Sequence, residues 1–427
     1  MMEHTVEKGK TLLVDGPASV SLLSGAVEVL GATLKVGDKI VIREGKRMPF
    51  EVRKRAAFDL MLSEEVSFEE VDGSTIPSSW EDTTQKILSH EKPVTVMVMG
   101  GIDSGKTSLC TYLANKALRE GWKVAIIDAD VGQSDIGPPS TIGFSRVAVP
   151  IKDLFEVETE NAYFVGLTSP SGAINKVMEG LTALRDRALE MGVNCLVINT
   201  DGWVEGEDAA SYKVKLTEKV APDIVVGIQQ GDELAPIITA LKGVEVLSIE
   251  SPPAIRRRDR EKRKVLRELS YKKYLKGAKI LTLLLSWVRV EGAPTRFGTT
   301  TTEHMEKIND LLGTSAVYCE ETPNASFIIL RKNQWVDGER VKRAEQSLLK
   351  RVKIIREGEE EGLLVALHDW LGNFLGIGVL CAIDYERGVM KIYTPIRRNI
   401  STIRVGQIKL DKKGREIGIS PVFADYE

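Results

Sequence analysis

The chain has 427 residues, which is too long for one compact core, so we expect two or three domains. Hydrophobic residues make up 43% and charged residues 28% of the sequence, and this balance excludes a chain that is disordered throughout. The 58 basic and 61 acidic residues give a net charge of −3, so any surface that attracts nucleic acid has to be local.

The residue pattern excludes further classes of protein. The longest apolar stretches, such as residues 280–287, are far shorter than the roughly 20 residues of a membrane helix, and the charged start of the chain contains no signal-peptide core. The 4 cysteines and 4 histidines are scattered without a CxxC pair, which excludes a disulfide scaffold and a Cys/His zinc site. We therefore expect an intracellular protein without a membrane segment, in which any metal is bound by oxygen.

Residues 1–75 are predicted to form a β-rich N-terminal domain. Glycines separate its apolar segments, which lie at residues 11–14, 26–34 and 39–43. A polar stretch follows, in which Ser79 with Asp82 is expected to cap a short helix. This stretch marks the boundary to the next domain.

Residues 76–277 change to apolar runs that alternate with helical segments. Strands are predicted at residues 94–99, 123–128, 162–166, 194–199 and 223–228. Helices are predicted at residues 107–120 and 173–191. This order indicates an α/β domain with a parallel sheet flanked by helices.

Residues 278–427 are predicted to form a β-rich C-terminal domain. Turns rich in glycine and proline separate its apolar runs, which lie at residues 279–290, 326–331, 362–369, 374–385 and 388–395. A helix that mixes basic and acidic residues is expected around residues 337–357.

Directly after the first strand of the α/β domain, residues 100–107 read GGIDSGKT and fit GxxxxGK[ST] at the start of a helix. Glycines let the backbone N–H groups turn inward, Lys106 reaches the β and γ phosphates, and Thr107 places a hydroxyl on Mg²⁺. The predicted nucleotide-binding residues are Gly100, Gly101, Ile102, Asp103, Ser104, Gly105, Lys106, Thr107 and Ser108. The domain is therefore predicted to be a P-loop NTPase, whose phosphate acceptor the motif leaves open.

Two carboxylates, Asp128 and Asp130, follow the next predicted strand. Open α/β sheets bind their ligands at the carboxyl ends of strands, so both should lie beside the phosphate loop. Because side chains alternate along a strand, we expect both to point the same way, one organising Mg²⁺ and the other approaching the attacking hydroxyl. The predicted metal-binding residues are Thr107, Asp128 and Asp130.

One alternative class of P-loop protein is disfavoured. ATPases that position partition or nitrogenase machinery carry an extra lysine at the start of the loop, whereas Val98 and Met99 stand here. An isolated DxD pair more often caps a turn, but its place beside a phosphate loop favours a functional role.

Four segments together resemble one family. They are DADVGQS from Asp128, FVGLTSPSG from Phe164, NTDGWVEG from Asn199 and the basic run from Arg256. They are similar to those of the RNA 5′-hydroxyl kinases associated with pre-mRNA cleavage and pre-rRNA processing, most of all the archaeal polynucleotide 5′-kinases. The resemblance implies a kinase domain between two β-rich domains.

The resemblance also implies roles for individual residues. Lys106 matches a catalytic phosphate-binding residue, Asp130 the catalytic base, and Gln133 a substrate-binding glutamine of the second motif. The TxGW motif that clasps the substrate end corresponds to Thr200, Gly202 and Trp203, and an indole can stack on any base. Thr168, followed by Ser169 and Pro170, matches a segment near the substrate.

Residues 254–277 contain eleven basic and three acidic residues, a net charge of +8 within a chain of net −3. In the family this region is a lid whose arginines close over the transferred phosphate. Two assignments of these arginines are open. Counting back from the helical segment SYKKYLKG makes Arg258 and Arg263 the catalytic arginines. An RxxxR spacing instead selects Arg256 and Arg260, which we assign to substrate binding.

The expected function is transfer of the γ-phosphate of ATP to the 5′-hydroxyl of single-stranded RNA, and of DNA as well, with Mg²⁺ or another divalent cation. RNA-processing proteins are the expected partners, and the cytoplasm of an archaeal cell the expected location. Two alternatives are an ATP-bound scaffold of an RNA-processing complex and an ATPase switch that uses no nucleic acid. The carboxylate pair and the lid arginines disfavour the scaffold, and Trp203 disfavours the switch.

Overall fold

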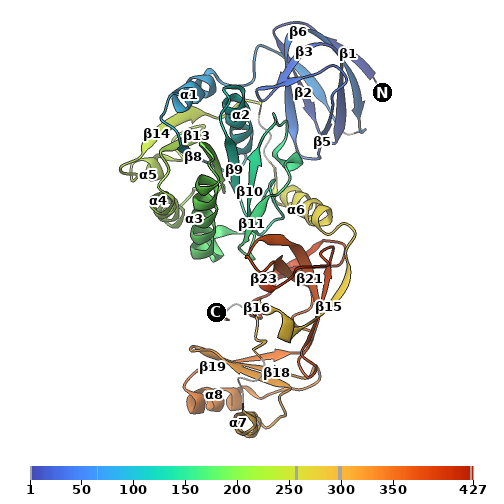
Figure 1. Cartoon of the computed structure of the whole chain (residues 1–427), viewed down its shortest axis with the longest axis vertical. Helices are drawn as coiled ribbons and strands as arrows, with labels where there is room; N and C mark the ends of the chain where they lie inside the picture. Colours follow the sequence, from blue (N-terminus) through green and yellow to red (C-terminus); the bar gives the residue numbers. More distant parts are fainter. Residues whose placement is uncertain (1, 65, 255–257, 297–300, 424–425, 427) are drawn as a thin grey trace. The chain divides into compact units, whose positions relative to one another are not determined.

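The structure is a computed structural model that describes residues 2–64, 66–254, 258–296, 301–423 and 426. The chain divides into two compact units, Met1–Arg267 and Glu268–Glu427. The first unit holds an antiparallel sheet and an α/β domain, and the second is β-rich, as the sequence predicts (Figure 1). No helix in the described ranges is long and apolar enough to cross a bilayer.

The first sheet of the first unit is built on two long strands, β3 and β6, which pair with each other. Alternation along β3 turns Val20 and Leu22 into a core shared with Phe50 and Phe58 of β6. Its strands are β1 (Met2–Val6), β2 (Lys10–Asp15), β3 (Ala18–Val29), β4 (Ala32–Leu34), β5 (Lys39–Ile42), β6 (Arg47–Leu62) and β7 (Phe68–Asp72).

The α/β domain carries helices on both faces of its sheet, whose order is β11-β10-β9-β12-β8-β13-β14. Helices α1 and α2 pack on one face and α3, α4 and α5 on the other, where each buries its apolar side. The strands are β8 (Val94–Gly100), β9 (Val124–Ala129), β10 (Thr141–Val147), β11 (Asn161–Phe164), β12 (Cys195–Thr200), β13 (Ile224–Gln229) and β14 (Glu245–Glu250). The helices are α1 (Ser78–Leu88), α2 (Lys106–Arg119), α3 (Ile174–Glu190), α4 (Glu207–Val220) and α5 (Ala235–Ile238). Helix α6 (Arg260–Tyr274) contains the boundary between the two units.

Several details of this domain differ from the prediction, and helices α4 and α5 were not predicted. Strands β10 and β14 were not predicted, and β10 pairs antiparallel with both β9 and β11, beside an otherwise parallel sheet. Residues 130–140 form no helix between β9 and β10, so the chain turns back beside the strand it has just left. Helix α1 begins at Ser78 and has no side-chain cap, so the expected cap by Ser79 is wrong.

The second unit contains a larger and a smaller sheet. The larger has the order β15-β22-β21-β20-β23-β16, and the smaller, β17-β18-β19, is covered by α7 and α8. The strands are β15 (Lys279–Leu284), β16 (Arg289–Glu291), β17 (Tyr318–Glu321), β18 (Ala325–Leu330), β19 (Arg351–Arg356), β20 (Leu363–His368), β21 (Phe374–Asp384), β22 (Val389–Thr394), β23 (Thr402–Leu410) and β24 (Glu416–Ile419). The helices are α7 (Thr302–Leu312) and α8 (Gly338–Leu348).

The helix expected around residues 337–357 is shorter than predicted. It ends at Leu348, because Leu349 adopts a left-handed conformation with φ of 55°. Residues 351–356 form β19 and pair with β18, so a β-branched run ends the helical segment.

His368 is a buried polar residue of the second unit. It is 2% exposed, and neither ring nitrogen has a hydrogen-bond partner among the residues that the structure describes. Burial, and then the positive charge of Arg404, lower the pKa of His368 from 6.5 to about 4. The neutral ring is therefore the form that the fold accommodates.

We expect the second unit to lose stability in mild acid through this residue. Because the pKa is lower in the folded state, the stabilisation is present above pH 6.5 and is lost as the pH falls toward about 4. The total loss should not exceed about 3 kcal/mol, and His368→Leu should flatten that part of the pH profile. Denaturant unfolding of the full chain across this window measures it, with the partly exposed His304→Gln as control. If the free energy of unfolding of His368→Leu changed with pH as steeply as that of the wild type, His368 would not be the cause of the loss.

Candidate active site

The loop between β8 and α2 has the geometry that the motif predicts for phosphate binding. Strand β8 ends at Gly100 and α2 begins at Lys106, so the N–H groups of the first helical turn open onto the loop. Gly105 precedes the helix with a positive φ of 104°, and a Cβ on Gly100 would lie 2.7 Å from the backbone carbonyl oxygen of Ile228. Glycine is therefore required at both positions.

Lys106 is the buried cation of this loop. Its Nζ donates to the carbonyl oxygens of Gly100 at 2.9 Å and Gly101 at 2.6 Å. Burial lowers the pKa of Lys106, whereas the negative charge of Asp130 acts to raise it. Lys106 and Asp130 therefore interact electrostatically across the loop.

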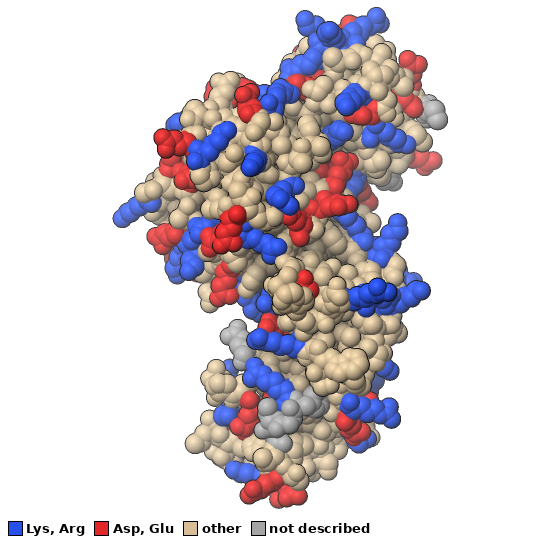
Figure 2. All heavy atoms as spheres, viewed as in Figure 1, with Lys and Arg blue, Asp and Glu red and all other residues tan. Residues whose placement is uncertain are grey.

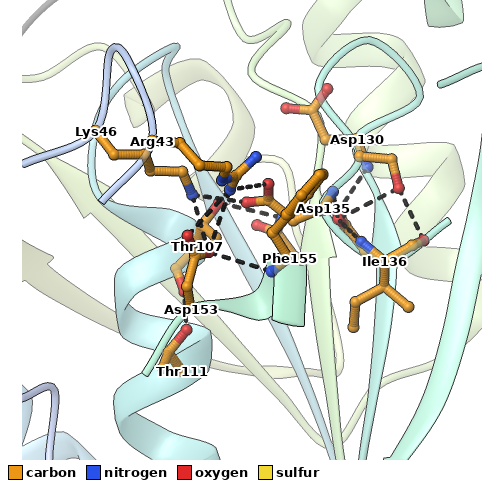
Figure 3. A network of polar contacts seen from close by, with 12 residues as sticks. Arg43, Lys46, Thr107, Thr111, Asp130, Asp135, Ile136, Asp153 and Phe155 are labelled. Carbon is orange, nitrogen blue, oxygen red and sulfur yellow. Dashed lines mark hydrogen bonds and ion pairs between the residues drawn. The ribbon is translucent and has the colours of Figure 1, made fainter. Parts of the chain in front are cut away.

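Asp128 is fully buried, and both of its oxygens are engaged. Oδ2 accepts from the backbone N–H groups of Asp135 at 2.6 Å and Ile136 at 3.2 Å, and Oδ1 accepts from Asn199 Nδ2 at 2.9 Å. Figure 3 shows Asp130, Asp135 and Ile136 on the loop that follows β9. Because β9 ends at Ala129, the alternation expected to orient the two carboxylates alike does not extend to Asp130.

Asp130 begins the turn after β9. Its Oδ1 accepts from the backbone N–H groups of Gly132 at 3.2 Å and Gln133 at 3.0 Å. Burial raises the pKa of Asp130, and the positive charge of Lys106 opposes that rise. Burial, followed by the charges of Asp135 and Asp130, raises the pKa of Asp128 to about 7. A carboxylate with a raised pKa is a stronger proton acceptor, which suits general-base chemistry.

Asn199, at the end of β12, is a site residue that sequence reasoning missed. Its Nδ2 donates to Asp128 and lies 3.5 Å from Thr107 Oγ1. Its Oδ1 is buried and has no hydrogen-bond partner among the described residues. A polar residue at the end of the apolar run NCLVIN was the available signal. The Asn199 side chain therefore has an oxygen that can accept a further bond, close to Thr107 at the start of α2.

The residues of the TxGW segment follow β12 and pack beside the phosphate loop. Thr200 is fully buried and its hydroxyl donates to the Val98 carbonyl at 2.8 Å, so it joins β12 to β8. A Cβ on Gly202 would lie 2.8 Å from the Ile102 side chain, which shows how closely the two loops approach. Trp203 is partly exposed, and its indole stacks on Tyr212 with ring centres 5.5 Å apart.

A buried ion pair supports the Trp203 loop. Asp201 Oδ1 accepts from the Trp203 backbone N–H at 3.0 Å, and its Oδ2 accepts from the Tyr212 hydroxyl at 2.9 Å. Lys213 of α4 is fully buried and its Nζ lies 3.0 Å from the same Oδ2. Neither Tyr212 nor Lys213 was predicted, because α4 brings them to Asp201 only in the folded chain.

The lid residues that the structure describes contact the phosphate loop and the loop after β9. Arg258 donates to both carboxylate oxygens of Asp103, and Arg263 Nη1 donates to the Arg258 carbonyl at 2.8 Å. Gln133 Nε2 donates to the Arg263 carbonyl at 3.0 Å. Arg260 is exposed at the start of α6, where Figure 2 shows a group of basic side chains, and Arg256 lies outside the described residues.

The segment after β11 lies beside the turn that Asp130 begins. A Cβ on Gly132 would be 2.8 Å from the Thr168 carbonyl oxygen. Thr168 is half-buried, Ser169 is exposed and Pro170 is buried. The structure therefore brings Thr168 and Gln133 to the same side of the sheet as Asp130.

A phosphate loop at the start of a helix, with buried carboxylates at the neighbouring strand end, defines a P-loop nucleotide-binding protein. A family model described as mRNA cleavage and polyadenylation factor CLP1 P-loop matches residues 100–277. Among solved structures, Clp1p in its complex with a Pcf11p segment has a TM-score of 0.65, covering 96% of this chain and 97% of that chain. At 12% identity this likeness shows a shared fold.

The chain is also similar to archaeal proteins named polyribonucleotide 5′-hydroxyl-kinase. The one from Thermococcus kodakarensis is 32% identical over 341 residues, which cover 78% of this chain and 93% of that protein. The one from Pyrococcus furiosus is 30% identical over 352 residues, which cover 81% and 95%. The chain belongs to the polyribonucleotide 5′-hydroxyl-kinase family.

Lys213→Met should destabilise the first unit strongly. The substitution keeps the apolar stem but leaves Asp201 buried without its cation, which typically costs about 3–5 kcal/mol. Adding Asp201→Asn should restore most of the loss, because the remaining amide carries no charge. Denaturant unfolding of the full chain measures both effects, and the exposed Lys215→Met on the same helix is the matched control. Wild-type stability in Lys213→Met would show that the pair does not hold the loop.

Proposed function

We propose that the chain transfers the γ-phosphate of ATP to the 5′-hydroxyl end of single-stranded RNA. The carrying observation is that Lys106, Asp130 and the loop of Trp203 gather at the carboxyl edge of one sheet, where Gly202 contacts Ile102 of the phosphate loop. Membership in the family supports the reaction class. DNA ends fit the same chemistry, since stacking and phosphate contacts need no 2′-hydroxyl.

The donor side of the reaction uses the phosphate loop. The inward N–H groups and the positive end of α2 suit the β and γ phosphates of ATP. A triphosphate in the loop would offer Lys106 phosphate oxygens in place of the carbonyls of Gly100 and Gly101. Lys106 then stabilises the charge that spreads over the transferred group.

A divalent cation fits the oxygens beside this loop. Mg²⁺ is usually held by one or two protein oxygens together with phosphate oxygens and water. Such oxygens are Thr107 Oγ1, an Asp130 carboxylate oxygen and Asn199 Oδ1, which has no hydrogen-bond partner within the described part of the chain. Asp128, whose two oxygens are already engaged, orients Asn199. When bound, the cation neutralises charge on the β and γ phosphates.

The acceptor side uses Asp130 and Trp203. Asp130 orients or deprotonates the 5′-hydroxyl, and its turn is fixed by the N–H groups of Gly132 and Gln133. Trp203, stacked on Tyr212, holds the terminal base, which contributes about 1–3 kcal/mol. Thr168 and Gln133 border the path of the nucleotide.

The lid supplies the remaining positive charge. Arg258 and Arg263 neutralise charge on the transferred phosphoryl group, and Arg258 is placed at the phosphate loop by Asp103. The exposed Arg260, together with Arg256, contacts RNA phosphates. A protein partner is also proposed, since the solved Clp1p is bound to Pcf11p. We propose that this chain acts in an RNA-processing complex in the cytoplasm of an archaeal cell.

Asp130→Asn should abolish phosphorylation while ATP binding is retained. The amide keeps an oxygen for the turn but cannot accept a proton, and loss of a general base typically costs about 100- to 10,000-fold in rate. Labelled ATP and a 5′-hydroxyl RNA oligonucleotide measure transfer, and a fluorescent ATP analogue measures binding. Transfer by Asp130→Asn at the wild-type rate would refute its role. Absence of transfer by the wild-type chain would favour the ATP-bound scaffold.

Trp203→Ala should weaken use of the oligonucleotide more than use of ATP. Removing the stacking surface should raise the KM for RNA by roughly 5- to 150-fold and leave the KM for ATP near its wild-type value. The exposed Trp335→Ala in the second unit is the matched control. If both variants behave alike in steady-state kinetics, Trp203 does not bind the substrate end.

A further inference from the structure

Four charged side chains join the N-terminal sheet to the α/β domain of the first unit. Arg43 and Lys46 lie in the turn between β5 and β6, and each reaches both Asp135 and Asp153 (Figure 3). The distances to Asp135 are 2.8 Å from Arg43 Nη2 and 2.8 Å from Lys46 Nζ. The two contacts to Asp153 are 3.1 Å and 3.3 Å. Two cations thus balance two carboxylates.

This quartet is largely removed from water. Asp135 and Asp153 are 8% and 7% exposed, and the Arg43 guanidinium lies 3.7 Å above the ring of Phe155. Burial alone would raise the pKa of Asp135, but the charges of Lys46 and Arg43 outweigh it and lower the pKa. The positions of the two carboxylates therefore depend on the cations from the N-terminal sheet.

The quartet includes one residue, Asp135, of the loop of residues 130–136 that Asp130 begins, which we call the acceptor loop. The side chain of Asp135 is held by Arg43 and Lys46, while its backbone N–H donates to Asp128. Asp128 in turn binds Asn199, the neighbour of Thr107. The loop that starts at Asp130 is thus fixed near its far end by a side chain contributed from another sheet.

The same turn also reaches the lid. A Cβ on Gly45, between the two cations, would lie 3.5 Å from Leu266 Cδ1 and 3.7 Å from Arg258 Cδ. Arg258 is the residue that binds Asp103 of the phosphate loop. A single turn of the N-terminal sheet therefore forms ion pairs with the acceptor loop and lies close to the lid.

We propose that Arg43 and Lys46 are positioning residues of the phosphoryl-transfer site, which hold the loop of residues 130–136 so that Asp130 faces the phosphate loop. The N-terminal sheet is then part of the catalytic apparatus and acts through Asp135. This proposal rests on the proposed kinase function. It predicts that loss of the two cations affects turnover more than binding of ATP.

The test is the double variant R43M/K46M in the full chain. Misplacement of the acceptor loop should lower kcat by about 100-fold. The KM for ATP should stay within about twofold of the wild-type value. Hydrogen exchange of the amides of residues 131–136 should accelerate by about tenfold or more, while those of the phosphate loop do not change. The conservative variant K46R should keep wild-type kcat.

The matched control breaks another contact between the same two parts of the unit. Arg119, at the end of α2 opposite Lys106, donates through Nη2 to Glu28 Oε1 at 3.1 Å and to the Gly31 carbonyl at 2.8 Å. R119M should leave kcat within about twofold of wild type. An equal loss in R119M and R43M/K46M would mean that general contact between the two parts, and not the quartet, supports catalysis.

A further pair of substitutions separates positioning from stability. Adding D135N and D153N to R43M/K46M removes the unpaired carboxylates, so thermal stability should recover while kcat stays low. Recovery of both would overturn the proposal. If the wild-type chain transfers no phosphate, the kinase assignment fails, but exchange of the loop amides in R43M/K46M still decides the structural claim. Unchanged exchange would refute it.

Discussion

One fully buried carboxylate, Asp128, organises the edge of the sheet on which the site is built. It stands at the end of β9, binds Asn199 at the end of β12, and accepts two backbone N–H groups from the returning loop. A buried carboxylate is tolerated only when donors surround it, so these three segments cannot separate without leaving a charge or a polar group unsatisfied. The position of the loop that carries Asp130 follows from this constraint.

The same rule governs the other buried charges of the site. Lys106, Asp130, Asp201 and Lys213 come from four different segments, and their opposite signs reduce the cost of burial for each. Ion pairs of this kind add little net stability compared with apolar packing, but they allow few alternative arrangements. Their contribution here is geometric: Asp201 holds the backbone of Trp203, and the charge of Lys106 acts on that of Asp130.

The sequence predicted those parts of the fold and site whose signal is local. The phosphate loop, the strands around it and the TxGW segment are continuous motifs, and the family resemblance they support is confirmed by relatives such as that of Thermococcus kodakarensis. Asn199 and Arg43 were not predicted because their partners are remote in sequence: Asn199 meets Asp128 across 71 positions and Arg43 meets Asp135 across 92. Lys213 is only 12 positions from Asp201, but no local motif marks the pair. The antiparallel β10 and the early end of α8 were missed because each depends on a loop conformation. The assigned roles of individual residues stay predictions.

The arrangement around Trp203 argues for recognition of an end of the strand rather than its interior. The indole already stacks on Tyr212, and the Gly202 backbone is pressed against the phosphate loop, so a base is offered one stacking surface close to the reactive centre. A terminal base has one neighbour and one uncovered face, whereas an internal base has neighbours on both sides that compete for stacking. Under the proposed function, the terminal nucleotide would gain most from this surface, and its free 5′-hydroxyl is the group that we propose to meet Asp130. We therefore expect selection of ends without selection of sequence.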